Sequence, residues 1–262
     1  MMSPFLMALL VKFGYVGTCF TGFQKGNGEN SIEDSILAIL KKYKISDDMR
    51  SAARTDRDVS AAGNVFMIRA VMEPEKIMKI LNAHSPNIYF IAYSFVDDDF
   101  NPRHCKTKRY TYMLKNPIPS FASTVKKFEG EHDFSAYCRK DARPTLRSIK
   151  SIECEAQGDL LKITIEGQSF VWEQIRSIIG FCNSPLMKDH FSDPFVNPPD
   201  RRIVAPPEPL LLSDISYDGI TFTGFIFPDK LRSLREQIDF HNLRAKIDEQ
   251  ILQAIHAKTR EL

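Results

Sequence analysis

Residues 49–71 read MRSAARTDRDVSAAGNVFMIRAV. A short strand is expected near Met49 to Ala53, and the run rich in apolar residues from Asn64 to Val71 predicts a second strand. The charged segment between them predicts a loop. Two strands therefore follow one another directly, with no helix between them.

The elements on either side of this segment complete a known pattern. Met7–Tyr15 alternates apolar residues onto one face and predicts a strand. Ser31-x-x-Asp34 resembles a capping box and predicts the start of a helix. Pro74 suits the first turn of another helix, and Ile88–Val96 is rich in aromatic and β-branched residues, as strands are. The order β-α-β-β-α-β predicts a ferredoxin-like unit.

The second half predicts a similar order of elements. The expected strands are residues 106–115, 145–156, 160–167 and 210–217, and the expected helical segments lie within 120–138 and 169–181. We therefore predict an α+β fold of two ferredoxin-like units, residues 1–100 and 101–228, with mainly antiparallel sheets side by side. A cleft between the units is a common place for a site. Residues 229–262 predict a long amphipathic helix that packs on the body or on a second subunit.

Composition restricts the class of protein. The chain has 262 residues, of which 43% are hydrophobic and 26% charged, as in soluble globular proteins. No apolar run approaches the roughly 20 residues that a membrane helix needs. The N-terminus, MMSPFLMALLV, lacks a basic region and a cleavage site, so it is expected to lead into the first strand rather than to act as a signal peptide. The five cysteines are scattered and form no C-x-x-C pair, which favours the reducing cytoplasm over disulfides or a zinc site.

The charge distribution favours a polyanionic partner although the net charge is only +2. Two short segments are strongly basic. The first, residues 101–116, contains no acidic residue and has the basic residues Arg103, Lys106, Lys108, Arg109 and Lys115. The second has Arg139, Lys140, Arg143, Arg147 and Lys150, with Asp141 as its acid. Tyrosines interleave the first segment, as is typical of nucleic-acid-binding proteins.

The loop Ala53–Ala61, ARTDRDVSA, has the character of a catalytic loop. Loops on a rigid scaffold often carry catalytic groups. Asp56 stands beside arginines, and a carboxylate near fixed positive charge stays ionised and can act as nucleophile or base. By itself, the same pattern also fits an aspartate that caps a turn.

Several motifs in register resemble those of the TruA-type tRNA pseudouridine synthases, over about residues 7–218. The loop resembles the family's Gly-Arg-Thr-Asp-x-Gly-Val-His/Ser-Ala. The other segments that match family motifs are YVGTCFTGFQ at 15–24, RYTY at 109–112, FEGEHDF at 128–134, GQSFVWEQIR at 167–176 and APPE at 205–208.

The sequence departs from the family pattern at a few positions. Asp58 stands where the family has glycine, and we expect this aspartate to adopt the positive φ of that position. Val16 and Phe23 replace the aspartate and tryptophan of the first motif, and Pro209 replaces a glycine. These differences concern loop geometry and the RNA footprint, because Asp56 itself is present.

The resemblance implies an isomerase that converts uridine to pseudouridine in the anticodon stem–loop of tRNA, at positions 38–40, without a cofactor or metal. It makes Asp56 the catalytic aspartate, Tyr110 the residue that stacks on the flipped uracil, and Arg176 the partner of Asp56. The residues expected to bind RNA are Arg54, Arg57, Arg103, Lys106, Lys108 and Arg109. The family also implies a homodimer in which tRNA contacts both subunits.

Two other functions remain open from the residues alone. RNA-recognition modules share the β-α-β-β-α-β order, so the chain could be a non-catalytic RNA-binding protein, although it lacks their Lys/Arg-Gly-Phe/Tyr-Gly/Ala-Phe-Val-x-Phe/Tyr motif. A hydrolase could pair Asp56 with Asp58 or Asp133, although their spacing does not favour it. His132 and Asp133 are expected to be structural.

Overall fold

The computed structural model describes residues 7–26, 30–184, 193–196 and 198–259. Residues 1–225 form one compact unit, and residues 226–262 form a second. The α+β class, the mainly antiparallel sheet and the C-terminal helix are confirmed. No helix in the described ranges is long and apolar enough to cross a membrane. The start of the N-terminal segment and part of the proline-rich stretch at 184–209 lie outside the described residues.

The first half has the predicted element order. Its elements are β1 (Met7–Tyr15), the 3₁₀ helix η1 (Gly17–Cys19), α1 (Ile32–Lys42), β2 (Arg50–Ser51), β3 (Ser60–Ala70), α2 (Pro74–His84) and β4 (Ile88–Val96). The two predicted helix starts are confirmed. The Ser31 hydroxyl accepts a hydrogen bond from the Asp34 backbone amide at 3.1 Å, and Pro74 begins α2.

The second half contains every predicted strand and two more. Its elements are β5 (Thr107–Lys115), α3 (Phe121–Val125), η2 (Lys126–Phe128), β6 (Gly130–Asp133), η3 (Ser135–Tyr137), β7 (Leu146–Gln157), β8 (Leu160–Gly167), α4 (Gln174–Cys182), β9 (Leu210–Ser216) and β10 (Thr223–Gly224). The additional strands are β6, which pairs with β7 inside a segment expected to be helical, and the short β10, which pairs with β4.

Two predicted boundaries differ from the structure. The helix expected from Ser169 begins at Gln174, because Glu173 has a left-handed backbone with φ 60° that ends the helix on its N-terminal side. The strand expected from Asn64 begins at Ser60. Its first residues pair with β9, so a distant part of the chain stabilises this extension.

The strands of both halves join into one continuous sheet. Its order is β10-β4-β1-β3-β9-β5-β8-β7-β6, and β2 pairs beside β3. β9 connects the halves, because it pairs with β3 on one side and with β5 on the other. The β3–β9 pairing is the only parallel one among the described strands.

The register of β9 brings two distant segments together. Ala61, the last residue of the charged segment 53–61, lies opposite Leu212, and Leu212 lies opposite Tyr110 of β5. The loop that carries Asp56 is therefore placed near the strand that carries Tyr110. This proximity depends on strand pairing between residues far apart in the sequence.

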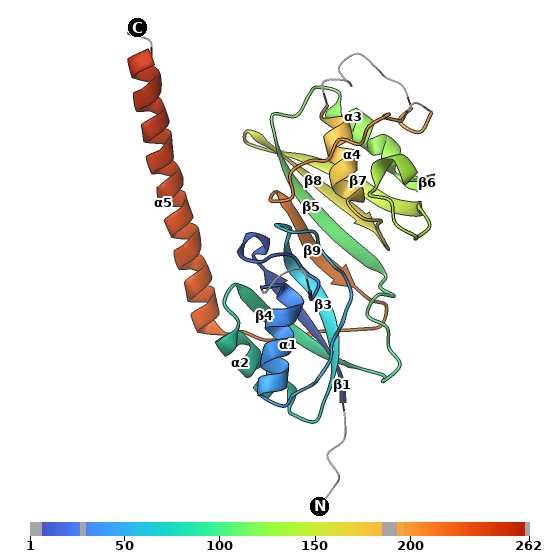
Figure 1. Ribbon diagram of the computed structural model, residues 1–262, viewed down its shortest axis with the longest axis vertical. Coiled ribbons are helices and arrows are strands. Elements are labelled where there is room, and N and C mark those ends of the chain that lie inside the picture. Colours follow the sequence, from blue (N-terminus) through green and yellow to red (C-terminus); the bar gives the residue numbers. More distant parts are fainter. Residues whose placement is uncertain (1–6, 27–29, 185–192, 197, 260–262) are drawn as a thin grey trace, which may run out of the picture. The chain divides into compact units, whose positions relative to one another are not determined.

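Each half has its own cluster of buried aromatic side chains. α1 lies over strands of the first half, where Phe13 contacts Phe66 and Phe90. α4 lies over strands of the second half (Figure 1), where Phe128 contacts Tyr137 and Phe181. Burial of large aromatic side chains contributes strongly to stability. The two clusters make each half a rigid support for its part of the sheet.

The second unit consists largely of α5 (Pro228–Thr259). The helix expected at 229–262 is thus confirmed over the described residues. Its apolar side chains Leu243, Ile247 and Ile251 are exposed, and the side chain of Ile255 lies outside the described part. What this apolar stripe packs against stays a prediction.

Candidate active site

The loop between β2 and β3 is held by hydrogen bonds to buried residues. The Tyr15 hydroxyl lies 2.8 Å from Oγ1 of Thr55. Asn64 is buried, and its side-chain amide donates to the Ala53 carbonyl at 3.1 Å and to the Tyr15 hydroxyl at 3.4 Å. Because residues of β1 and β3 supply these partners, the backbone next to Asp56 is fixed in position.

The segment after Asp56 packs closely against η1. A Cβ atom on Gly17 would lie 2.3 Å from the Val59 carbonyl oxygen, so this contact requires glycine. The Gly17 amide donates to the Ser60 hydroxyl at 3.0 Å. Asp58 has φ 67°, which confirms that an aspartate carries the left-handed conformation here.

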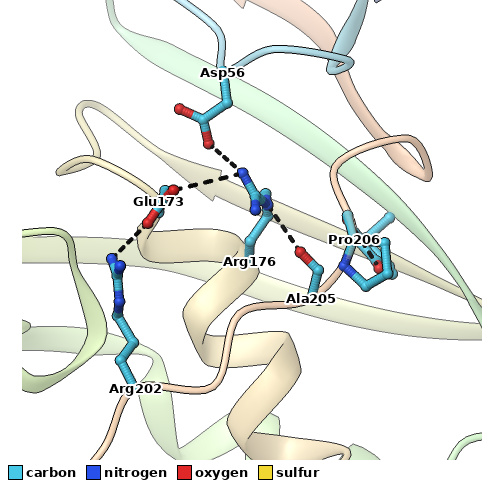
Figure 2. Close-up of polar contacts among 7 residues, drawn as sticks. Asp56, Glu173, Arg176, Arg202, Ala205 and Pro206 are labelled. Carbon is cyan, nitrogen blue, oxygen red and sulfur yellow. Dashed lines mark hydrogen bonds and ion pairs between the residues drawn. The ribbon is translucent and has the colours of Figure 1, made fainter. Parts of the chain in front are cut away.

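Arg176 from α4 contacts the Asp56 carboxylate. Its Nη1 lies 2.8 Å from Oδ2 of Asp56, and its Nε donates to the Ala205 carbonyl at 2.9 Å. The Ala205 amide in turn donates to the Arg176 carbonyl at 3.0 Å. Figure 2 shows the guanidinium held between the carboxylate and this backbone segment. The cation that contacts Asp56 therefore comes from α4 rather than from the arginines beside it in the sequence.

The environment of Asp56 makes it more basic than a free aspartate. Burial raises its pKa above the ordinary value of 3.8, and the charge and hydrogen bond of Arg176 oppose this rise. The negative charge of Glu173 raises the pKa further, while a hydrogen bond from the Trp172 side chain lowers it. The attraction of Arg176 favours the ionised form, but desolvation has the larger effect on the pKa. A more basic carboxylate is a better nucleophile or proton acceptor.

Tyr110 lies on β5 in the wall of the same cavity. Its ring meets the Phe170 ring edge to face, with centroids 5.3 Å apart. Burial raises the pKa of the Tyr110 hydroxyl well above its usual value, so the hydroxyl stays neutral. Tyr112, two residues along β5, is on the same strand face and is also buried, with its hydroxyl donating to the Pro206 carbonyl at 3.2 Å.

A cavity of about 830 Å³ contains the Asp56–Arg176 pair. Six of the residues expected at the site line it: Asp56, Tyr110, Arg176, Arg54, Arg57 and Arg103. Its volume lies within the roughly 300–1,000 Å³ range of small-molecule pockets. Three described residues from the first sequence motif, Thr21, Gly22 and Gln24, also line it.

Three residues expected to bind RNA lie elsewhere. Lys106 pairs with Asp218 at 2.8 Å, and Arg109 donates from Nε to Glu166 at 2.6 Å. Arg109 alternates with Tyr110 along β5 and so faces the other side of the sheet. Lys108 is partly buried, and desolvation lowers its pKa. None of the three belongs to the described lining of the cavity.

The cavity also contains residues that were not among the expected site residues. Arg139 and Arg143 come from the second basic segment, which could have identified them. The Arg139 guanidinium lies 4.1 Å from the centroid of the Trp172 ring, which is 39% exposed. Glu173 lines the cavity and forms an ion pair with Arg202 at 2.6 Å. No sequence pattern pointed to this ion pair.

The other carboxylates considered for a hydrolase are arranged differently. Asp58 lines the cavity and pairs with Arg57 at 3.7 Å. Asp133 is at the end of β6, where it accepts hydrogen bonds from Ser135 and Thr145. Within the described residues, no group of three or more His, Cys, Asp or Glu side chains is arranged to hold a metal ion.

Comparison with known proteins gives consistent matches. Residues 124–218 match a family model described as tRNA pseudouridine synthase. A Picrophilus torridus protein named tRNA pseudouridine synthase A is 42% identical over 225 residues, which cover 86% of this chain and 88% of that protein. A Thermoplasma acidophilum protein of the same name is 41% identical over 214 residues, covering 80% and 84%.

Similarity to solved structures is more distant. A crystal structure of a Cbf5-Nop10-Gar1 complex contains a chain that matches with a TM-score of 0.36 and 18% sequence identity. The match covers 58% of this chain and 40% of that chain.

Proposed function

Because the chain belongs to the tRNA pseudouridine synthase family, we propose that it isomerises uridine to pseudouridine in the anticodon stem–loop of tRNA, at positions 38–40, with Asp56 as the catalytic carboxylate. The observation that supports this most is the Asp56–Arg176 contact of 2.8 Å in a cavity large enough for a nucleotide. A basic, partly desolvated carboxylate is what the reaction needs beside the ribose.

The reaction is an isomerisation that needs no oxidant or energy source. The glycosidic C1′–N1 bond breaks, the detached uracil turns, and a C1′–C5 bond forms. The proton on C5 is then lost, and N1 regains one. Asp56 can serve as a nucleophile at C1′ or as a base toward a ribose proton, and both routes use the same carboxylate.

Aromatic residues in the cavity suit a base removed from the RNA stack. Tyr110 would stack on the target uracil, with Phe170 supporting its ring at 5.3 Å. Stacking of a base on an aromatic side chain contributes about 1–3 kcal/mol. The neutral Tyr110 hydroxyl adds no charge to this surface. The cavity wall thus offers both a stacking surface and a carboxylate for one nucleotide.

Arginines around the cavity suit the phosphates next to the target. Arg54 and Arg103 are exposed and line the cavity, and Arg139 and Arg143 line it from the second basic segment. Phosphate contacts position a nucleic acid without reading its sequence. Lys106, Lys108 and Arg109, which lie outside the described lining of the cavity, would contact tRNA farther from the reacting nucleotide.

We expect a cytoplasmic homodimer that acts without a cofactor or metal. The family resemblance supports the dimer, and the five free cysteines fit a reducing compartment. The substrate is proposed from the family and from the basic lining of the cavity.

The proposal is tested with unmodified tRNA transcripts. After incubation with the protein, carbodiimide-based mapping locates any pseudouridine, and Asp56→Asn is treated in parallel. We expect product in the anticodon stem–loop with the wild type and none with the variant. Binding of tRNA without product, unaffected by Asp56→Ala, would instead identify a non-catalytic RNA-binding protein.

A further inference from the structure

Four charged side chains of alternating sign form a row that begins at Asp56. Nη1 of Arg176 lies 2.8 Å from Oδ2 of Asp56 and 3.9 Å from Oε1 of Glu173. The other carboxylate oxygen of Glu173, Oε2, lies 2.6 Å from Nη1 of Arg202. Figure 2 shows the row, with Arg176 between the two carboxylates and Arg202 beyond Glu173. Two carboxylates therefore face the same nitrogen of Arg176, and among the described residues Glu173 has a second cation, Arg202, whereas Asp56 has none within ion-pair distance.

The backbone holds both ends of this row. Glu173 occupies the cap position of α4 with a left-handed φ of 60°, three residues before Arg176. Arg202 lies three residues before Ala205, which is hydrogen-bonded in both directions to Arg176. A Cβ atom on Gly180 would lie 2.5 Å from the Ile203 carbonyl oxygen, so α4 and this segment are in close contact. The segment at 202–205 thus supports Arg176 and supplies the partner of Glu173.

We propose that Glu173 and Arg202 are positioning residues for the reaction: Arg202 binds the Glu173 carboxylate, so that Arg176 stays bound to Asp56. This inference rests on the proposed function, which makes Asp56 the reacting carboxylate. Arg202 lies behind Glu173, outside the described lining of the cavity, and acts through Glu173 and Arg176.

The physical reason is competition between two carboxylates for one guanidinium. Glu173 and Arg176 are 15% and 13% exposed, so water does little to separate their charges. Without Arg202, the Glu173 carboxylate would gain from moving closer to Nη1 of Arg176, which is now 3.9 Å from its Oε1. Asp56 would then share Arg176 with Glu173, and the negative charge of Glu173 would no longer be compensated by Arg202.

The charged and titratable groups around Asp56 define what a pH profile would report. α4 and the turn before it contribute Arg176 and Glu173, and β5 contributes Tyr110, whose hydroxyl stays neutral. The loop of Asp56 itself contributes three charged residues to the cavity lining, namely Arg54, Arg57 and Asp58. The other charged residues of the lining are Arg103, Arg139, Asp141 and Arg143. Glu173 acts to raise the pKa of Asp56. Changes at Glu173 or Arg202 should therefore move the acid limb of activity.

The test is a double-mutant cycle with Glu173→Gln, Arg202→Gln and the double variant, and Arg201→Gln as an exposed neighbouring control. For Arg202→Gln we expect kcat to fall about tenfold and the acid limb of kcat/KM to move up by about half a pH unit, with KM little changed. Glu173→Gln should move the acid limb to lower pH. The double variant should recover most of the kcat lost in Arg202→Gln, because no carboxylate then competes for Arg176.

A merely structural ion pair would behave differently. Losses that add in the double variant, with an unmoved acid limb, would overturn the inference. If Arg202→Gln fails to fold by circular dichroism, Arg202→Lys and Glu173→Gln still test it through the acid limb.

A measurement independent of activity separates this inference from the proposed function. The Asp56 carboxyl group can be titrated by ¹³C NMR, with its resonance assigned by its loss in Asp56→Asn. A wild type that makes no pseudouridine would overturn the function, while an Asp56 pKa that rises in Arg202→Gln and falls in Glu173→Gln would support the charge row. Unchanged Asp56 titration in both variants would overturn it.

Discussion

Asp56 and Arg176 are 120 positions apart in the sequence, yet their side chains meet at 2.8 Å. The contact joins the loop before β3 to the first turn of α4. Arg176 is 13% exposed and Asp56 is 21% exposed, so the pair is largely shielded from solvent. Charge pairs in such surroundings interact more strongly than pairs on the surface.

Arg176→Lys should depress turnover although it keeps the charge. A lysine ammonium cannot contact Asp56 and the Ala205 carbonyl with separate, fixed nitrogens as the guanidinium does. We expect kcat to fall about tenfold or more, and Arg176→Ala to lose more and to raise the pKa of Asp56. Single-turnover assays on a tRNA transcript measure this. Turnover equal to the wild type in Arg176→Ala would count against the pairing.

Asp56→Asn should stabilise the protein at neutral pH while abolishing activity. The folded state raises the pKa of Asp56 above 3.8, so it binds this proton more tightly than the unfolded chain does. The tighter binding of this proton adds to the free energy of unfolding. That contribution is fully present below about pH 3.8 and is lost as the pH rises through the folded-state pKa. At pH 7 the variant should melt about 1–4 °C above the wild type, and the gap should close toward pH 3. A lower melting temperature at pH 7 would contradict the raised pKa.

The role of Tyr110 should depend on its ring rather than on its hydroxyl. Burial keeps that hydroxyl neutral, and its ring contacts Phe170. Tyr110→Phe should therefore retain turnover within about tenfold, whereas Tyr110→Leu should lose the stacking that contributes about 1–3 kcal/mol. Activity assays on both variants, with tRNA affinity measured by filter binding, compare the two. Equal loss in both would show that the hydroxyl takes part.

Gly180→Ala should impair the site, although Gly180 is not part of the described cavity lining. The added methyl would lie 2.5 Å from the Ile203 carbonyl oxygen and 2.9 Å from the Ala205 amide nitrogen. This segment includes the Ala205 carbonyl, which accepts a hydrogen bond from Arg176. We therefore expect kcat to fall and the free energy of unfolding to fall by about 1–3 kcal/mol. Gly224→Ala is the matched control, since nothing lies within 4 Å of its new methyl. Denaturant unfolding and turnover measure the two effects.

The arginines that line the cavity should contribute more to tRNA affinity, through contacts with phosphates, than Lys106, which lies outside the lining. Arg54→Gln and Arg103→Gln should each weaken tRNA binding about 3–10-fold and reduce the slope of log affinity against log salt by about one. Lys106→Gln is the control, because Lys106 already pairs with Asp218 outside the described lining. A larger effect at Lys106 than at Arg54 would place the main phosphate contacts elsewhere.

Much of the fold could be predicted because its signals are local. The capping box at Ser31 and the proline at residue 74 begin helices where the sequence indicates. β6, β10 and the first residues of β3 were missed, since they become strands by pairing with β7, β4 and β9, respectively. The start of α4 was misplaced, because the left-handed conformation of Glu173 is not what a glutamate usually adopts.

The candidate site was predictable in part, and the family motifs supplied most of it. They pointed to Asp56, Tyr110 and Arg176, which line one cavity. Arg109 was expected to bind RNA, and this stays a prediction. The alternation of β5 turns it to the face opposite Tyr110, outside the described cavity lining, where it pairs with Glu166. Arg202 was not predicted, since its partner depends on the path of a segment with no regular structure.

The sequence by itself determined the order of elements, the charged loop and the family motifs, because periodicity, capping and turn chemistry act over a few residues. The family motifs implied the pairing of Asp56 with Arg176, but only the tertiary structure decided which other charges meet. β9 pairs with β3 and β5 and so brings the Asp56 loop to Tyr110, and the segment at 202–205 brings Arg202 to Glu173. The distance between two charges in a desolvated site sets their interaction energy, and that distance depends on contacts between residues far apart in the chain.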